Sequence, residues 1–444
     1  MEHQLTYTQH VSHTSGDPVH AYAQWRMQRG LQPGLLLVDF SIRADWVVKD
    51  HQQALTAIYC LDSDASLCFS VTDKALVASE RDPQTQYALW VSEHNIARVA
   101  LGNVLPLSPV FIPKPWGREI WFTGVEERGV CNVISPHGQT PIPWVQAAMP
   151  QLRIGPANQS LILLKILDPV AKAVQGDLYF ELHEQKREVY VVTHVDRDAW
   201  PDGTGYIRYG FSADKLAQYP DAKEFRRRYL DAVQNYEQLR RTLDAADKSS
   251  KQRQSGSDAA LLARERDLRA AMDSFTHLRP LRVGDVVKVP LLTPHSLQHG
   301  VRTIEFQTPV YERKILSFAQ EVVTQNHWDT IEAVAQMNLH TPLDKPFTAL
   351  RNDEQVLIER IVDFDDFEVH RVQMSPSATL QDIGSDSYQI LVVVEGTLAI
   401  EGNNYGPEEA LILPADWAGK VTSNDETGAV SFLLAIPRNS AVES

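Results

Sequence analysis

The chain has 444 residues, of which 43% are hydrophobic and 22% charged, and its formal net charge at pH 7 is −15. This length predicts two or three domains with well-buried cores. The acidic balance argues against a nucleic-acid-binding or anionic-membrane surface, and no apolar run approaches the roughly 20 residues of a membrane span. The polar start, without a signal-peptide pattern, and three cysteines without metal-finger spacing predict a cytoplasmic protein.

Residues 1–107 are predicted to form a β-rich amino-terminal module. The runs LLLVDFSI, LTAIYCL, ASLCFSV and YALWVS are short, mostly apolar and separated by polar turns, which is typical of strands. This module contains no cluster of residues that indicates chemistry.

The stretch GDLYFELHEQKREVYVV, residues 176–192, contains the most informative motif, E-x-H-x4-E. It alternates like a strand, and residues two apart in a strand point to the same face. We therefore expect Glu181 and His183 to project together. After a turn at residues 184–187, Glu188 can join them from the next strand. The motif predicts half of a metal site.

Residues 212–276 are predicted to form an inserted helical hairpin. Apolar residues recur at helical spacing in EFRRRYLDAVQNYEQLRRTL and again in DAALLARERDLRAAM. The small polar run KSSKQRQSGSD between them indicates a flexible link. We expect the hairpin to project from the domain that carries it, with its arginine-rich faces in solvent.

The segment GDVVKVPLLTPHSL supplies a further ligand, His295, near a strand end. His299, four residues later, could compete with it as a ligand. His295 is preferred because its spacing from Pro290 in the sequence fits the strand end. With Glu181, His183 and Glu188, the set has two carboxylates and two imidazoles, which suit a divalent transition metal. Zinc, iron, manganese, nickel and cobalt all accept such ligands.

A second β-rich unit is predicted in residues 339–444. The segment SYQILVVVEGTLAIEGNNYGPEEALILPADWAGKVT repeats the strand and turn rhythm of the metal-ligand segments. Gln389 stands where Glu188 stands in the first copy, and Gly419 stands where His295 does. We therefore expect a metal-free carboxy-terminal domain after a metal-binding domain at residues 108–338.

The order of the motifs resembles that of the type I mannose-6-phosphate isomerases, which are cupins. The segments PVFIPKPWGREIWF, VISPHGQTPIP, LILLKILDP, ELHEQKREVYVV, GDVVKVPLLTPHSL and IEFQTPVYERKIL follow the family's order over about residues 108–320. Trp116 and Gly117 match its opening motif. The resemblance implies a mainly β fold of tandem cupin barrels (double-stranded β-helices, or jelly rolls), with the helical hairpin and the amino-terminal module as additions.

The resemblance also implies residue roles. The resemblance implies Zn²⁺ as the metal, with Fe²⁺ and Mn²⁺ as alternatives, because His183, Glu188 and His295 match three of the family's four zinc ligands. Glu181 stands where the family has glutamine. The added negative charge should strengthen cation binding and weaken the metal as a Lewis acid. Two residues are expected to be catalytic, since the lysine of the family's K-T-E motif is matched by Lys186, and its active-site arginine is matched most nearly by Arg313.

The activity implied is a metal-dependent isomerisation of mannose 6-phosphate and fructose 6-phosphate through a cis-enediol. Two departures leave alternatives open. The loop that the family inserts between its Q-x-H-P and K-T-E motifs is missing, and no phosphate-contacting serine is evident. One alternative is an isomerase of an unphosphorylated sugar. The other is a non-catalytic sugar-binding or regulatory cupin, with the helical hairpin as the site of a protein partner or of self-association.

Overall fold

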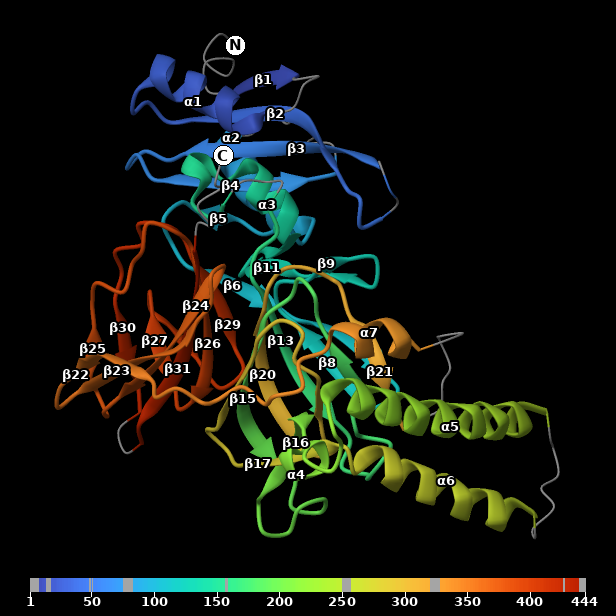
Figure 1. The fold of residues 1–444 in the computed structure, drawn as a ribbon. Coiled ribbons are helices and arrows are strands. Elements are labelled where there is room, and N and C mark those ends of the chain that lie inside the picture. The colour runs from blue at the N-terminus through green and yellow to red at the C-terminus, as the bar shows by residue number, and fades with distance from the viewer. Residues whose placement is uncertain are drawn as a thin grey trace. The chain divides into compact units, whose positions relative to one another are not determined.

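A computed structural model describes residues 8–12, 17–47, 49, 51–74, 83–155, 159–249, 257–319, 328–425 and 428–438. The chain forms two compact units, whose helices and strands are labelled in Figure 1. Unit 1 comprises Met1–Val110, Trp121–Leu164 and Phe347–Ser444, and unit 2 comprises Phe111–Ile120 and Lys165–Pro346. The division into three domains at residues 107 and 338 stays a prediction, since the two units are interleaved along the chain.

The amino-terminal part of unit 1 is a five-stranded sheet with helices, in the order β1-β2-β3-β4-β5. Three of the predicted strand runs coincide with β2, β3 and β4. The fourth, YALWVS, was wrong, because it lies in α2, where its buried residues Tyr87, Trp90 and Val91 have helical spacing. The elements are β1 (Thr8–Ser12), α1 (Pro18–Arg29), β2 (Gly34–Arg43), β3 (Gln52–Leu61), β4 (Leu67–Thr72), α2 (Pro83–Glu93) and β5 (Val99–Ala100).

Local signals explain where α1 begins. Asp17 caps the helix, since its carboxylate accepts a hydrogen bond from the backbone N–H of His20 at 3.0 Å. Pro18 follows at the start of the helix, where its fixed φ is already helical and its missing N–H is not needed. Further along, the helix buries Ala21 and Trp25.

The rest of unit 1 is dominated by two sheets, whose buried residues form one hydrophobic core. Their orders are β12-β11-β6-β29-β26-β31-β24-β23-β22 and β25-β30-β27-β28. The strands are β6 (Leu105–Ser108), β11 (Asn132–Ser135), β12 (Gly138–Pro141), β22 (Thr348–Asn352), β23 (Val356–Asp363), β24 (Phe367–Met374), β25 (Thr379–Leu380), β26 (Gln389–Glu395), β27 (Leu398–Ile400), β28 (Asn403–Tyr405), β29 (Ala410–Leu413), β30 (Val421–Ser423) and β31 (Val430–Pro437).

Strand β6 joins distant parts of the chain within this unit. It pairs with β11 on one side and with β29 on the other, where Leu105 lies opposite Ile412. The smaller elements of the unit are the hairpin of β9 (Val125–Glu126) and β10 (Gly129–Val130), the helix α3 (Ile142–Ala148) and the 3-10 turn η1 (Pro150–Leu152).

Unit 2 contains two sheets that pack around a second core. A six-stranded sheet has the order β18-β15-β20-β13-β8-β7, and a five-stranded sheet has the order β17-β16-β19-β14-β21. The strands are β7 (Val110–Lys114), β8 (Gly117–Trp121), β13 (Leu163–Pro169), β14 (Phe180–Leu182), β15 (Glu188–Val195), β16 (Gly205–Phe211), β17 (Thr276–Leu281), β18 (Val286–Val289), β19 (His295–Leu297), β20 (Val301–Gln307) and β21 (Lys314–Ser317).

The predicted helical hairpin is confirmed as α5 (Ala222–Ser249) and α6 (Ser257–Asp273), preceded by the short α4 (Ala213–Leu216). Residues 250–256, within the predicted link, lie outside the described residues. The first half of α5 is part of the unit 2 core, since Phe225, Tyr229, Val233 and Tyr236 are fully buried there. The hairpin is therefore anchored by aromatic packing on the sheets and by contacts with α7 (Thr330–Gln336).

The structure confirms the predicted mainly β architecture with an inserted helical hairpin. In each unit, two sheets pack around one hydrophobic core, and unit 1 also contains the five-stranded amino-terminal sheet. The arrangement as tandem cupin barrels stays a prediction. None of the helices in the described ranges combines the length and the apolar character that crossing a bilayer requires.

Candidate metal centre

The four predicted ligands come from three strands of unit 2 and the residues beside them. Glu181 lies in β14 and His183 follows its last residue, whereas His295 begins β19, the neighbouring strand, where it is paired with Glu181. Glu188 begins β15 in the other sheet. The turn at residues 184–187 therefore carries the chain from one sheet to the other and brings all four side chains to the space between them.

These side chains converge. Ligand atoms of Glu181, His183 and His295 all lie within 4.8 Å of one another. Glu188 lies against both imidazoles, with its Oε1 3.4 Å from Nε2 of His183 and its Oε2 3.0 Å from Nε2 of His295. His183, Glu188 and His295 are each at most 2% exposed, and the Glu181 side chain is 18% exposed.

Hydrogen bonds to backbone carbonyls orient both imidazoles. Nδ1 of His183 lies 3.0 Å from the carbonyl oxygen of Glu312, and Nδ1 of His295 lies 3.0 Å from that of Thr293. Because a carbonyl can only accept, each Nδ1 carries a proton and donates it. The lone pair of a neutral imidazole is then on Nε2, the atom that each ring directs toward the carboxylates. This is the usual arrangement of metal-binding histidines.

Burial and neighbouring charges give these groups different pKa values. Burial lowers the pKa of His183, and the ammonium of Lys186 lowers it further, which favours the neutral imidazole. Burial also opposes charge on His295, but its hydrogen bond to Glu188 and the charge of that carboxylate raise the pKa of His295 overall. Although burial raises it, Lys186 and both imidazoles hold the pKa of Glu188 well below its ordinary value.

Two buried atoms at the centre indicate that a cation fits here. Within the described part of the chain, Oε2 of Glu181 and Nε2 of His183 have no hydrogen-bond partner. Leaving buried acceptors without partners costs roughly 1–3 kcal/mol each, and a cation among them would satisfy both. Imidazole nitrogens and carboxylate oxygens are ligands that Zn²⁺ accepts. The donor set therefore fits the expected metal.

The two predicted catalytic cations border this cluster. Lys186 is buried, with Nζ 2.6 Å from Oε1 of Glu188. Arg313 is more exposed, at 38% of its side chain, with Nη1 3.8 Å from Oε2 of Glu181. Its guanidinium also lies 4.7 Å from the centroid of the Tyr179 ring. Each cation thus lies beside a carboxylate that is itself a predicted metal ligand.

The histidine that was not chosen as a ligand, His299, lies outside the cluster. Its Nδ1 is 2.6 Å from Oδ1 of Asp177, and its ring stacks on Trp200 at 4.6 Å between centroids. The backbone of Gly176 passes close to that of Val170, because a Cβ on Gly176 would lie 2.0 Å from the Val170 carbonyl oxygen. The geometry thus brings His295, rather than His299, to the other three side chains.

A second buried ion pair, which the sequence reasoning missed, lies in the six-stranded sheet. Lys165 of β13 and Glu305 of β20 are 3.5 Å apart, and Lys165 also bonds to the side-chain amide oxygen of Gln307 at 2.5 Å. All three are buried. Gln307 is paired in register with Glu188, and Glu305 lies two residues before it, so these three side chains share one face of the sheet. The pair therefore belongs to the same centre.

Glu305 has the most informative pKa of this pair. Burial raises the pKa of Glu305 to about 8, and the charges of Glu188 and Glu119 add to the increase, although Lys165 and Lys186 oppose it. A carboxyl group with a pKa in this range can both accept and donate a proton near neutral pH. The sequence signal for this pair is one charged residue inside each of two apolar runs, LILLKIL and IEF.

In the second copy of the motif, Gln389 is buried and donates a hydrogen bond from Nε2 to the carbonyl oxygen of Ile383 at 2.6 Å. A Cβ on Gly419 would lie 2.1 Å from the ring of Trp417. The absence of metal from the carboxy-terminal domain stays a prediction.

Comparison with protein-family models and with curated proteins gives no match. Solved structures do match. Mannose 6-phosphate isomerase from Bacillus subtilis has a TM-score of 0.53 at 15% identity, with 75% of this chain and 99% of that chain covered. A zinc-bound mannose 6-phosphate isomerase has a TM-score of 0.52 at 14% identity, and the apo form from Salmonella typhimurium has 0.51 at 14%. These two matches cover 74% of this chain and 99% and 98% of the other chains, respectively. The chain therefore has the fold of the mannose 6-phosphate isomerases, as a divergent structural relative.

Proposed function

We propose that this protein is a metal-dependent aldose–ketose isomerase that interconverts mannose 6-phosphate and fructose 6-phosphate. The observation that carries the proposal is the convergence of Glu181, His183 and His295 in an isomerase fold. Two of their buried ligand atoms, Oε2 of Glu181 and Nε2 of His183, have no hydrogen-bond partner among the described residues. With Glu188, these residues would hold Zn²⁺. A bound divalent metal would supply Lewis acidity toward the sugar oxygens.

The reaction requires a base beside the carbonyl and positive charge near the developing enediolate. Glu305 is the proposed base, because it shares a sheet face with Glu188 and its raised pKa keeps it proton-active near neutral pH. The buried Lys165 holds that carboxyl group in place at 3.5 Å. Lys186 and Arg313 supply positive charge at the edge of the ligand cluster, where the sugar oxygens or the phosphate would lie.

The charge count of the centre supports a phosphorylated substrate. Four cations pair with four carboxylates: Lys114 with Glu119 at 3.1 Å, Lys165 with Glu305 at 3.5 Å, Lys186 with Glu188 at 2.6 Å and Arg313 with Glu181 at 3.8 Å. These eight groups cancel when all are ionised, a state that a bound divalent metal would favour by lowering the pKa of Glu305. The metal would then leave an excess of two positive charges. A phosphate dianion would balance that excess.

An isomerase of an unphosphorylated sugar is the second candidate, and the same four pairs favour it in one respect. Each cation already has a carboxylate partner, so a phosphate would have to compete for it.

An assay of zinc-loaded protein with mannose 6-phosphate, run beside free mannose, tests the proposal directly. Formation of fructose 6-phosphate supports it, whereas turnover of mannose alone supports the second candidate. Activity on neither sugar would contradict both and favour a non-catalytic binding protein.

The side chain of Glu312 provides a test of how the metal ligands are positioned. Its carboxylate accepts hydrogen bonds from the backbone N–H groups of Glu184 and Gln185, at 3.0 and 3.2 Å, and its own carbonyl oxygen accepts from His183. We expect Glu312→Ala to lower metal affinity about 10- to 100-fold. The turn that follows His183 loses the two hydrogen bonds that the Glu312 carboxylate accepts from the backbone of Glu184 and Gln185.

Competition with a chelating dye measures that affinity. Glu312→Gln, which keeps an acceptor oxygen, should lose less. Glu332→Ala removes an exposed carboxylate that pairs with Lys314 and should lose nothing. An unchanged affinity in Glu312→Ala would show that the turn holds His183 without this carboxylate.

A further inference from the structure

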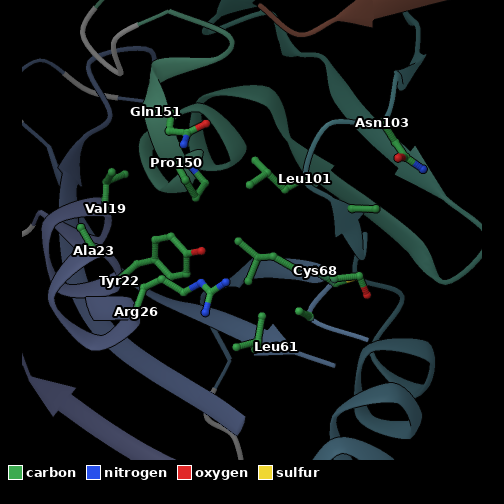
Figure 2. Close-up of a pocket in the computed structure, with 14 residues that line it drawn as sticks. Val19, Tyr22, Ala23, Arg26, Leu61, Cys68, Leu101, Asn103, Pro150 and Gln151 are labelled. Atoms are coloured by element: carbon green, nitrogen blue, oxygen red, sulfur yellow. The ribbon is translucent and has the colours of Figure 1, made fainter. Parts of the chain in front are cut away.

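A cavity of about 750 Å³ lies in the amino-terminal part of unit 1 and shares no lining residue with the metal centre (Figure 2). Its wall combines one side of α1, the β3–β4 hairpin, the chain after β5, and η1. Its volume is within the range of small-molecule sites. The lining residues that matter for its chemistry are Tyr22, Arg26, Leu61, Leu101 and Pro150.

The charge of this cavity is unusual for the protein. Among the lining residues that the structure describes, Arg26 is the one charged side chain and none is acidic, although the chain carries 57 acidic and 42 basic residues. Figure 2 shows the Arg26 guanidinium and the Tyr22 hydroxyl directed from α1 into the cavity. Burial raises the pKa of Tyr22, although Arg26 opposes the shift, so the phenol stays a neutral donor.

The walls on either side of these donors are mostly apolar and firmly held. The Tyr22 ring stacks on Tyr59 at 4.8 Å between centroids, which fixes the aromatic side chain from which the hydroxyl projects.

A second cavity of unit 1 provides a contrast. It has a volume of about 630 Å³, and its lining includes Arg43 but also Asp45, Glu126 and Glu127. Arg43 is neutralised there by Asp45, with 2.5 Å between the charged atoms. A guanidinium alone thus does not distinguish the two cavities. What distinguishes the cavity at Arg26 is a guanidinium with no carboxylate beside it among the described residues of the lining.

We propose that the Arg26 cavity binds a small organic oxyanion, a carboxylate or a phosphate ester, on an apolar body. The guanidinium would pair with two oxygens of the anion, a geometry in which arginine is strongly favoured. The Tyr22 hydroxyl would donate to the same group. The apolar body would cover Leu61, Leu101 and Pro150, which line the same cavity.

Calorimetric titration of the full chain with four probes tests this. Phenyl phosphate and benzoate join an oxyanion to an apolar ring, inorganic phosphate is the anion alone, and benzyl alcohol is the ring alone. We expect phenyl phosphate or benzoate to bind most tightly, and Arg26→Gln to weaken that binding about tenfold or more. The stronger of the two anions identifies whether a phosphate ester or a carboxylate is preferred.

Three variants separate this site from others. Arg43→Gln, at the guanidinium of the second cavity, should leave the affinity unchanged, and so should His295→Ala, which alters the metal centre. Arg26→Lys keeps the charge and should bind with intermediate affinity, with melting temperatures compared to show that each variant is folded. Failure of both aromatic anions to bind, or equal binding by Arg26→Gln, would overturn the proposal.

Discussion

Replacing His183 or His295 with alanine is expected to remove the bound metal and to lower kcat at least about a thousandfold. Each change deletes one imidazole whose Nε2 points into the cluster and leaves the buried carboxylate of Glu188 without that partner. Metal catalysis of this kind is worth several kcal/mol of transition-state stabilisation, and every 1.36 kcal/mol is a factor of ten in rate.

Metal content after dialysis, measured by atomic emission, checks this expectation before any rate is measured. His194→Ala is the matched control, because His194 is an exposed histidine on β15, the strand that Glu188 begins. The control should retain stoichiometric metal. Full metal content in both His183→Ala and His295→Ala would rule out the centre, whatever the activity of the protein.

Replacing Glu305 with glutamine is expected to lower kcat by roughly a hundred- to ten-thousandfold, the range for loss of a general base, with metal content unchanged. Glutamine has a similar shape and can still accept a hydrogen bond from Lys165. The unaltered protein should gain activity as pH rises through the pKa of Glu305, since the base must be ionised. A bound cation lowers that pKa, so the midpoint should lie at or below about 8.

The same variant should change how stability depends on pH. The pKa of Glu305 is raised from an ordinary value of 4.5 to about 8 on folding, so the folded state holds this proton more tightly than the unfolded state. Its contribution to the free energy of unfolding is therefore complete below pH 4.5 and is lost as pH rises through 8. Urea unfolding of metal-free protein at pH values on both sides of that pKa measures this loss. The free energy of unfolding should decline less with rising pH in Glu305→Gln than in the unaltered protein.

Equal declines in the free energy of unfolding of the unaltered protein and of Glu305→Gln would show that Glu305 is ionised throughout this pH range. Retained kcat in Glu305→Gln would assign the base to another group.

Local patterns were sufficient to predict that the four proposed ligands lie together. Period-two alternation placed Glu181 and His183 together, the following turn returned Glu188 to them, and the strand end selected His295 over His299. Each of these inferences depends on a few neighbouring residues and on the geometry of a strand. The helical hairpin was also evident, because its apolar spacing continues for several turns.

Long-range pairing could not be predicted in this way. Lys165 and Glu305 are separated by 140 residues and meet because β13 and β20 are neighbours in the six-stranded sheet. A lysine in an apolar run does not show which strand will pair beside it. The strand assignment of YALWVS failed because the local pattern itself is ambiguous. A short apolar run fits either a helix or a strand until its packing is known.

The pairing of β6 with β29 has a consequence for the order of folding during synthesis. Residues 105–108 emerge early, but their partner strand at residues 410–413 emerges among the last. All of unit 2 is complete once residue 346 has been made. We therefore expect unit 2 to fold on the ribosome while β6 still lacks its β29 partner. Chains released at that stage should aggregate through the unpaired edge of β6.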